Sequence, residues 1–495
     1  MDRSLLRNKL SLIGIGLAII SFFLAVYLLA LSMFARDTNP YTGIITFFVL
    51  PMHIIFGVFL IILGMILERR RRRRQAPEEI PLFPVIDFNS PRTRRYLFWT
   101  VGLFVGFLLF SAVGSYEAYH FTDSTTFCGR ICHQVMEPEF TAYQNSPHAR
   151  VACVDCHIGP GADWFVKSKM SGMYQIFATT FHTYPQPIPT PIEDLRPAQE
   201  TCEQCHWPKQ FYGAVQKEIH HFMADEENTP WTINLLLKVG GGNPTYGEVG
   251  GIHWHMAISN KIEYIATDEA RQEIAWIRQT DPDGRVTIYQ SEEAPLEGSP
   301  ESYEIRTMDC IDCHNRPTHI FRSPSAAMNI ALQTGKIDRS LPNIKERGVD
   351  VLAAKYETKE AALAAISQEI DAYYQENYPD IYYAKPTEIT KAIDAIKTIY
   401  GDNFFPYMNA RWDVYPENVG HFIWKGCFRC HDGKHVSEEG TAINNDCDSC
   451  HVIISQGTGE QKAVSLDGLE FKHPVDIGEA WKEMNCSECH TGALP

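Results

Sequence analysis

No cysteine in this sequence stands alone. The chain of 495 residues contains 14 cysteines, which form seven close pairs, and a histidine directly follows the second member of every pair. A zinc knuckle or a redox dithiol also uses two nearby cysteines, but neither needs a histidine at that position each time. The histidine after every pair, with no cysteine left over, therefore argues against both of these kinds of site.

The cysteine pairs have the spacing that attaches a c-type haem. Six pairs enclose two residues, and the first pair encloses three. In a C-x-x-C-H motif, two thiols form thioethers with one porphyrin and the adjacent histidine binds the iron. The pairs are Cys128/Cys132, Cys153/Cys156, Cys202/Cys205, Cys310/Cys313, Cys427/Cys430, Cys447/Cys450 and Cys486/Cys489, and the histidines are His133, His157, His206, His314, His431, His451 and His490. We therefore predict seven covalently attached haem c groups.

The chain also has enough histidines to supply a second axial ligand to most of the irons. Seven of its 19 histidines belong to the motifs, which leaves twelve others. Two histidine ligands make a low-spin, six-coordinate iron whose geometry changes little on reduction. This type of ligation suits electron transfer.

Long apolar runs are absent after Tyr116, whereas three precede it. They cover about 10–35, 43–67 and 96–116, and each approaches the roughly 20 residues that a membrane-spanning helix needs. The first run is too long for a signal peptide, so we expect an uncleaved anchor. Basic residues precede the first run and fill the loop between the second and third. The positive-inside rule then places the N-terminus in the cytoplasm and the chain after Tyr116 in the periplasm, with the spans in the bacterial inner membrane.

One histidine lies inside a predicted span. His53 follows Pro51 by two residues in the second apolar run. Either it bonds a backbone carbonyl that the proline leaves free, or it marks a functional site within the membrane. A b-type haem there would need a second ligand, and no other span contains a histidine.

Basic charge is scarce after Tyr116. The chain up to Tyr116 contains 13 Lys and Arg and 6 Asp and Glu, and the chain beyond it contains 31 Lys and Arg and 54 Asp and Glu. A partner that docks by electrostatic steering, such as a periplasmic c-type cytochrome, should then present a basic face. Solubility of an acidic domain is the other explanation. The arginine run at 69–74 is explained by its place beside a membrane span, so we expect contact with the lipid bilayer and no nucleic-acid partner.

From residue 127 the sequence resembles the NapC/NirT family of membrane-anchored tetrahaem quinol dehydrogenases. The first matching block contains Phe127, Cys128, Cys132, His133, Met136, Tyr143, Ser146, His148, Cys153, Cys156 and His157. The later blocks are the Cys202 motif with His220 and His221, and the Cys310 motif with His319. The resemblance implies that the haem nearest the membrane oxidises quinol and that three more carry the electrons outward.

The resemblance also implies the second ligand of three haems. It assigns His148 to the fourth haem, His319 to the second, and either His220 or His221 to the third. Lys169 falls where the family often has a lysine near the quinol pocket, although a solvated charge beside Lys167 would equally explain it.

The first motif departs from the family pattern. It reads C-x-x-x-C-H, and Met136 follows His133 by three residues instead of two. Either of these residues is therefore a candidate ligand of the first iron, which makes Met136 a candidate for the quinol site. A low-spin first haem with His120 or His182 as its second ligand is the alternative. Quinol oxidation also releases two protons, and His120 is one candidate acceptor.

Four segments are predicted. The membrane anchor covers 1–116, and a tetrahaem domain covers 117–322 with a small β insertion at about 223–306. A helical spacer covers 323–403, and a trihaem module covers 404–495. The predicted fold class is mainly α, with little regular structure in the haem modules.

Five further histidines are candidates for ligands in the insertion and the trihaem module. His253, with His255 beside it, could supply one ligand from the insertion. His421, His435 and His473 match the three haems of the last module in number, so we take them as its second ligands.

The whole layout is similar to that of seven-haem inner-membrane cytochromes of metal-reducing bacteria. This similarity implies a menaquinol dehydrogenase that passes electrons to periplasmic carriers in anaerobic respiration, and onward toward extracellular metals. The alternatives are an electron-relay subunit of a larger complex and a multihaem enzyme of the nitrite or hydroxylamine type.

Overall fold

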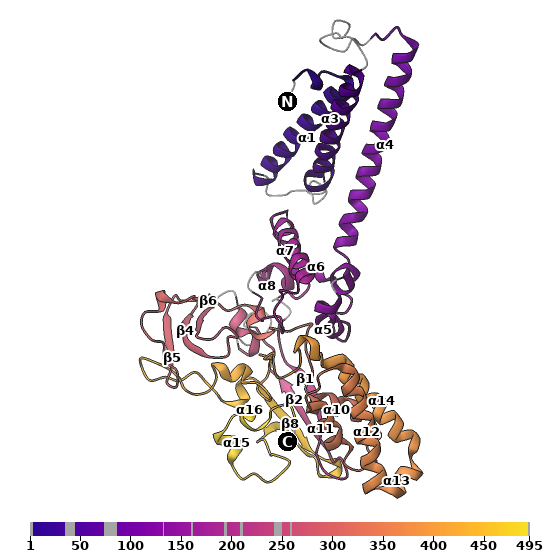
Figure 1. The fold of residues 1–495 in the computed structure, drawn as a ribbon. Helices are drawn as coiled ribbons and strands as arrows, with labels where there is room; N and C mark the ends of the chain where they lie inside the picture. The colour runs from indigo at the N-terminus through magenta and orange to yellow at the C-terminus, as the bar shows by residue number, and fades with distance from the viewer. Residues whose placement is uncertain are drawn as a thin grey trace. The chain divides into compact units, whose positions relative to one another are not determined.

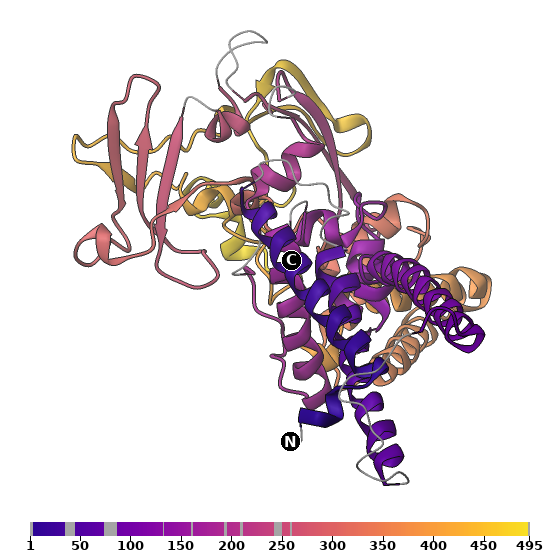
Figure 2. The same ribbon diagram turned by 90° about the horizontal axis from the view of Figure 1, so that it is seen from above.

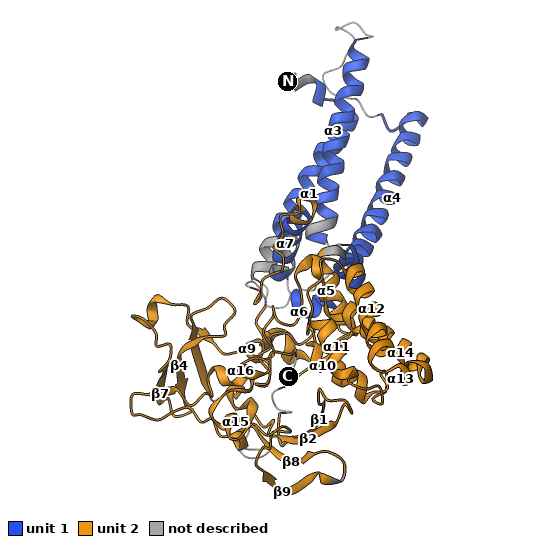
Figure 3. Ribbon diagram, turned by 60° about the horizontal axis from the view of Figure 1, so that its bottom comes forward, with its two compact units in different colours: residues 1–131, 152–176 blue, residues 132–151, 177–495 orange. Residues whose placement is uncertain are grey.

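The chain forms two compact units. The computed structural model describes residues 3–34, 45–73, 87–131, 133–159, 162–192, 196–207, 211–241, 250–257 and 260–493. Unit 1 comprises Met1–Ile131 and Ala152–Ile176, and unit 2 comprises Cys132–Val151 and Phe177–Pro495 (Figure 3).

Unit 1 contains three helices that are long and apolar enough to cross a membrane. They are α1 (Lys9–Phe34), α3 (Leu50–Arg72) and α4 (Pro91–Thr122) (Figure 1). The prediction of three spanning helices is confirmed. The bounds differ, since α4 continues beyond the third apolar run at both ends.

Helices α1 and α3 pack closely because small residues line their contact. A Cβ built on Gly14 would lie 2.5 Å from the Gly57 carbonyl oxygen, and one on Gly64 would lie 2.4 Å from Ser11 Oγ. The Ser11 hydroxyl donates to the Ile61 carbonyl across the same contact, at 3.1 Å. Small residues of this kind let membrane helices approach until dispersion forces and interhelical hydrogen bonds hold them together.

His53 lies buried within unit 1, with 3% of its surface exposed. Its Nδ1–H donates to the Val49 carbonyl at 2.6 Å, and its ring meets Phe107 of α4 edge-on at 5.2 Å between centroids. Its Nε2 has no hydrogen-bond partner among the described residues. His53 thus bonds a backbone carbonyl of its own helical turn, whereas the carbonyl that Pro51 leaves without a partner in an α-helix is that of residue 47.

Short helices follow the spans and carry or precede the first motifs. The segment η4 (Phe127–Ile131) is followed by α5 (His133–Gln144), α6 (Cys153–His157), α7 (Ala162–Phe181) and α8 (Ala198–Thr201). Helix α6 is the second motif itself, and α8 leads directly into the third.

Unit 2 contains two antiparallel sheets, and each joins the insertion to the C-terminal part of the chain. The four-stranded sheet has the order β1-β2-β8-β9, and the five-stranded sheet has the order β6-β3-β4-β5-β7. The strands are β1 (Val215–Phe222), β2 (Pro230–Leu237), β3 (Lys261–Ala266), β4 (Ile274–Thr280), β5 (Val286–Ser291), β6 (Arg306–Thr307), β7 (His435–Ser437), β8 (His451–Gly457) and β9 (Ala463–Leu469). The trihaem segment therefore completes sheets that the insertion begins.

A helical layer forms the main side-chain core of unit 2. Its helices are α10 (Pro324–Gln333), α11 (Ile344–Ala353), α12 (Lys359–Asn377), α13 (Pro379–Ala384) and α14 (Pro386–Asn403). One apolar stripe of α14 is buried, since Ile389, Ile393, Ile396 and Tyr400 are at most 9% exposed. Figures 1 and 2 agree in placing this layer and the five-stranded sheet on opposite sides of unit 2.

The remaining elements of the described chain are single turns. They are η1 (Arg3–Leu6), η2 (Ile45–Val49), η5 (Cys202–Gln204), η7 (Ile252–Met256), η8 (Pro300–Ser302), α9 (Cys310–Cys313), η9 (Pro406–Met408), η10 (Gly426–Arg429), η11 (Cys447–Ser449), η12 (Gly459–Gln461), α15 (Ala480–Glu483) and α16 (Cys486–Cys489). The predicted fold class, a three-helix anchor followed by modules of short elements with small sheets, is confirmed.

Candidate functional site

Each cysteine pair of unit 2 lies on one helical turn. In the Cys310 motif, the His314 N–H donates to the Cys310 carbonyl at 2.8 Å, and the His490 N–H makes the same bond to Cys486. Residues three apart on a helical turn lie on the same side, so the two thiols of a motif face one porphyrin edge. All thirteen cysteines in the described part of the chain are free thiols. Cys132 lies outside the described residues.

The cysteines of the motifs differ in burial, which the sequence did not indicate. Five of the described cysteines are exposed and the other eight are half-buried; the exposed ones are Cys156, Cys205, Cys313, Cys447 and Cys489. Cys205 directly follows the short turn η5, and its neighbours Gln204 and His206 are exposed as well. The assignment of these cysteines to haem stays a prediction that depends on the motif spacing and on the histidine that follows each pair.

An acidic residue inside three of the motifs stabilises the turn. Asp312 accepts a hydrogen bond from the Asp309 N–H at 2.7 Å, and Glu488 accepts one from the Asn485 N–H at 2.9 Å. Asp155 accepts from the Ala152 N–H at 3.2 Å in the same way. These bonds satisfy amide donors that the start of a helix leaves free, so the motif sequence itself shapes the attachment turn.

Five motif histidines each face a second histidine. A metal–imidazole bond is about 2 Å long, so two imidazoles on opposite sides of one iron have ring centres about 6 Å apart. The pairs and their centroid distances are His148/His206 at 6.0 Å, His253/His314 at 6.3 Å, His255/His431 at 5.7 Å, His421/His451 at 6.2 Å and His473/His490 at 6.0 Å. The side chains present therefore fit an iron with two histidine ligands at each of these five places.

Hydrogen bonds orient several of these rings. The His253 Nδ1–H donates to the Val239 carbonyl at 2.9 Å, and the His431 Nδ1–H donates to the Asn444 carbonyl at 2.6 Å. His255 and His473 donate similarly, to Ile252 and Val475. A proton held on Nδ1 leaves the Nε2 lone pair available to a metal and sets the direction of the ring.

Burial keeps other members of these pairs neutral. It lowers the pKa of His255, His314, His421 and His451, because a low-dielectric environment disfavours the imidazolium. Only the neutral imidazole binds a metal. The environment of these rings therefore favours the ligating form.

The structure places His148 differently from what the resemblance implies. Its ring lies against His206, the histidine of the third motif, whereas His253 faces His314 of the fourth. His221 instead contacts the Asn329 side chain, with 3.4 Å between Nδ1 and Nδ2. His220 lies on β1 with its Nε2 3.8 Å from Glu218, and no ring contact between it and a motif histidine occurs among the described residues.

His435 does not take the place expected of a ligand. It is 1% exposed, its Nδ1 bonds to Asp432 at 2.9 Å, and its Nε2 donates to the Ile274 carbonyl at 2.8 Å. Burial lowers its pKa, but these two hydrogen bonds outweigh that effect and raise it. Since both ring nitrogens are engaged, the structure favours His255 over His435 as the partner of His431.

The other two histidines expected to serve the trihaem module do face motif histidines. His421 lies against His451, and His473 lies against His490. His319 is held by Glu139, since its Nδ1–H donates to the backbone carbonyl at 3.0 Å and lies 3.1 Å from a carboxylate oxygen of the same residue. Burial lowers the pKa of His319 as well.

The candidate quinol-site residues are only partly described. Met136 is half-buried on α5, and the His120 ring lies 4.3 Å from that of Tyr116 at the end of α4. Lys169 is on α7 and His133 begins α5, but the side chains of both lie outside the described part. In unit 1, the Cys128 and Cys153 thiols lie within hydrogen-bonding distance, so the first two motifs adjoin there.

Two histidines of the insertion, His253 and His255, each face a motif histidine, whereas the sequence predicted one ligand from this segment. Both lie on the 3-10 turn η7. At three residues per turn, side chains two positions apart point in different directions. The signal for this was the glycine-rich sequence before the turn, which does not favour a strand.

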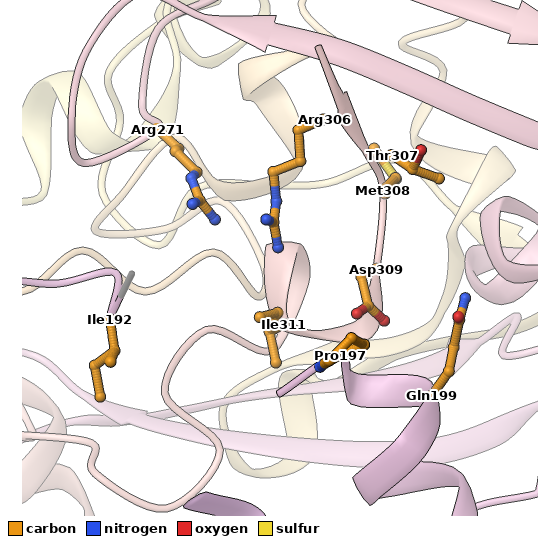
Figure 4. Close-up of a pocket in the computed structure, with 9 residues that line it drawn as sticks. All are labelled: Ile192, Pro197, Gln199, Arg271, Arg306, Thr307, Met308, Asp309 and Ile311. Atoms are coloured by element: carbon orange, nitrogen blue, oxygen red, sulfur yellow. The ribbon is translucent and has the colours of Figure 1, made fainter. Parts of the chain in front are cut away.

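A small cavity lies beside the fourth motif. It has a volume of about 250 Å³, and Arg271, Arg306 and Asp309 contribute its polar lining (Figure 4). Asp312 binds both guanidinium groups, with Arg306 Nε at 2.7 Å and Arg271 Nη1 at 3.5 Å. Ligand sites for apolar molecules are lined mainly by apolar side chains, so this lining differs from what a quinol ring requires.

Comparison with known proteins agrees with the haem motifs. Residues 90–188 match the N-terminal region of the NapC/NirT cytochrome c family. The chain is 45% identical to the cytochrome c-type protein ImcH of Geobacter sulfurreducens over 487 residues, which cover 98% of this chain and 95% of that protein. It is 33% identical over 78 residues to the cytochrome c-type protein NrfH of Wolinella succinogenes, covering 15% of this chain and 44% of that protein. No solved structure matches the chain. The chain therefore belongs to the NapC/NirT family as a multihaem c-type cytochrome homologous to ImcH.

Proposed function

We propose that this protein oxidises menaquinol in the bacterial inner membrane and passes the electrons through seven haem c groups to a periplasmic carrier. The five facing histidine pairs are the observation that carries this proposal. When bound, haem c supplies one-electron transfer, and two histidine ligands keep the iron low-spin in both redox states. A chain of such sites suits conduction of electrons better than binding of a substrate at an iron.

The first motif is the proposed quinol site. It follows α4 by a few residues, so it lies where a membrane helix ends. Met136 or His133 would bind the first iron, and Lys169 would hydrogen-bond a quinol oxygen. Each quinol releases two electrons and two protons, and His120 at the end of α4 is placed to accept a proton.

His319 is the proposed second ligand of the haem attached at Cys153 and Cys156. Its Nδ1–H is held by Glu139, which itself pairs with Arg316 at 3.2 Å. A carboxylate behind a ligating histidine fixes the tautomer and increases the basicity of the ligand. This arrangement supports the role that the family resemblance implies for His319.

The proposal is tested with the purified full-length protein under anaerobic conditions. A soluble menaquinol analogue should reduce part of the haem, observed as the reduced c-type absorption bands, and intact mass should show seven attached haems. Haem that dithionite reduces but the quinol analogue leaves oxidised would contradict quinol oxidation.

A pair of variants tests the quinol site. We expect Lys169→Met to raise the KM for the analogue several-fold with little change in the spectrum, because a single hydrogen bond contributes about 1 kcal/mol. Lys167→Met is the matched control, since Lys167 lies over the Trp164 ring at 4.5 Å. A larger effect in the control would move the site to Lys167.

An electron-relay subunit is the second candidate, because the five facing histidine pairs would serve a relay equally well. Co-purification of an equimolar membrane protein, together with no reduction by quinol in its absence, would favour that role.

A further inference from the structure

The turn η7 faces motif histidines of both the tetrahaem core and the trihaem module. It joins β2 of the four-stranded sheet to β3 of the five-stranded sheet. Both sheets contain strands from the C-terminal segment, since β8 pairs with β2 and β7 pairs with β5. The insertion and the trihaem segment therefore form one structure around this turn.

Backbone contacts hold η7 in place. The Ile252 N–H donates to the Lys238 carbonyl at 2.8 Å, and the His253 N–H donates to the Gly240 carbonyl at 3.0 Å. Gly251 has φ +91°, and a Cβ there would lie 2.5 Å from the Lys238 carbonyl oxygen. Only glycine combines this backbone conformation with so close an approach.

The side chains of η7 point to different neighbours. The His253 ring is nearly parallel to His314, with 10° between their planes, and it stacks on Phe211 at 4.3 Å. The His255 ring is perpendicular to His431, at 89°. Between them, Trp254 packs against the core of the five-stranded sheet.

The two motifs that these histidines face are joined directly. Arg429, which lies between Cys427 and Cys430, donates from Nη2 to the Asp312 carbonyl at 2.8 Å and from Nη1 to the Arg271 carbonyl at 2.7 Å. Asn418 also donates to the Asp312 carbonyl, at 2.9 Å. The turn α9 of the fourth motif and the turn η10 of the fifth are thus held together by side-chain to backbone hydrogen bonds.

We propose that His253 and His255 are the sixth ligands of two different irons, those attached at Cys310/Cys313 and at Cys427/Cys430. The insertion then serves as the joint between the tetrahaem core and the trihaem module, because one turn positions a haem of each. This inference rests on the haem content of the proposed function and adds which residues connect the two modules.

The Nδ1–H bonds of the two histidines support this role. His253 is fixed by the Val239 carbonyl and His255 by the Ile252 carbonyl, both at 2.9 Å. Each ring therefore has one nitrogen oriented by the backbone of the insertion and the other available to an iron. The rival ligand, His435, has neither ring nitrogen available.

The test measures ligation without quinol, so its outcome does not depend on quinol oxidation. His253→Met and His255→Met are each compared with the unchanged protein by redox titration and by near-infrared magnetic circular dichroism. Each variant should show one new methionine-ligated haem and one potential shifted upward, since methionine favours the reduced iron. The titration should leave the other six haems unchanged.

Electron paramagnetic resonance separates the two sites. Parallel imidazole planes give a rhombic low-spin signal, and perpendicular planes give a highly anisotropic one. His253→Met should reduce the rhombic signal, and His255→Met should reduce the anisotropic signal by the equivalent of one haem.

Control variants decide against the alternatives. His220→Met should leave all signals unchanged, whereas a methionine-ligated haem in His435→Met would overturn the assignment of His255. If His253→Met or His255→Met still carries seven haems and shows an unchanged ligand spectrum, the proposal that one turn ligates a haem of each module is wrong. If a methionine variant does not accumulate, His253→Gly or His255→Gly is grown with imidazole, which should restore the low-spin state.

Discussion

At the scale of single residues, Lys345 is the most unusual buried group. It is 1% exposed, and its Nζ donates to the Ser325 carbonyl at 2.6 Å and to Asn329 Oδ1 at 2.8 Å. Lys345 forms no ion pair with a carboxylate of the described residues. Burial lowers its pKa to about 7, because no negative charge offsets the loss of hydration. The neighbouring His221, whose pKa burial and the Lys345 charge lower to about 4, remains neutral near pH 7.

Lys345 should make stability increase with pH. The lysine has a lower pKa in the folded state than in the unfolded state, so between about pH 7 and 10 the unfolded chain binds more protons. Stability then rises as the pH increases through this range, by at most about 2–3 kcal/mol between pH 7 and 9. Lys345→Met should abolish this rise, as measured by thermal melting of the purified protein at several pH values.

A surface lysine provides the control for this prediction. Lys391 is exposed on α14, and Lys391→Met should keep the pH dependence of the unchanged protein. Equal pH dependence in Lys345→Met and the unchanged protein would show that Lys345 is not the titrating group.

At the scale of elements, the turn η7 and its glycine are the most sensitive to change. Gly251→Ala adds a Cβ close to the Lys238 carbonyl and places alanine at φ +91°. We expect a loss of about 2 kcal/mol or more in stability, since the backbone conformation alone costs about 1–2 kcal/mol. Displacement of the turn should also disturb both of its haem ligands, seen as simultaneous changes in the rhombic and anisotropic resonance signals.

The variant Gly298→Ala is a control that has the backbone strain of an alanine at positive φ without displacement of η7. Gly298 has φ +89°, and a Cβ built there meets nothing within 4 Å. This variant should lower the melting temperature through backbone strain alone and leave the haem signals as they are. Equal haem changes in the two variants would contradict the specific role of η7.

At the scale of the whole molecule, charge is separated along the chain. The part up to Tyr116 is basic, and the remainder has 31 Lys and Arg against 54 Asp and Glu. Haem propionates would add negative charge to that acidic part. Opposite charges on two partners raise the association rate, and salt screens the effect over a Debye length of about 10 Å at 0.1 M.

Electron transfer to a basic cytochrome c should therefore slow as salt is added. We expect the second-order rate, measured by stopped flow from the reduced protein, to fall several-fold between about 50 and 200 mM salt. An acidic cytochrome of similar potential is the control, and its rate should rise or stay constant. The same decrease with both acceptors would contradict steering by charge.

The sequence by itself determined the local features of this protein. The attachment turns depend on residues within a few positions of each other, as when Asp312 bonds to the Asp309 N–H inside its own motif. The three spans follow from the length and apolarity of continuous segments, which the structure confirms.

The tertiary structure alone decided which distant residues meet. The resemblance assigned His148 to the fourth haem, but its ring lies against His206 of the third motif. A count of spare histidines selected His435 as a ligand of the trihaem module, but its Nε2 donates to the Ile274 carbonyl. Spacing along the chain carries no information about such contacts, because they depend on how the strands of the insertion pair with those of the C-terminal segment. The joint at His253 and His255 is of this kind. Its two partners lie 61 and 176 residues further along the chain, and only the folded sheets bring them to one turn.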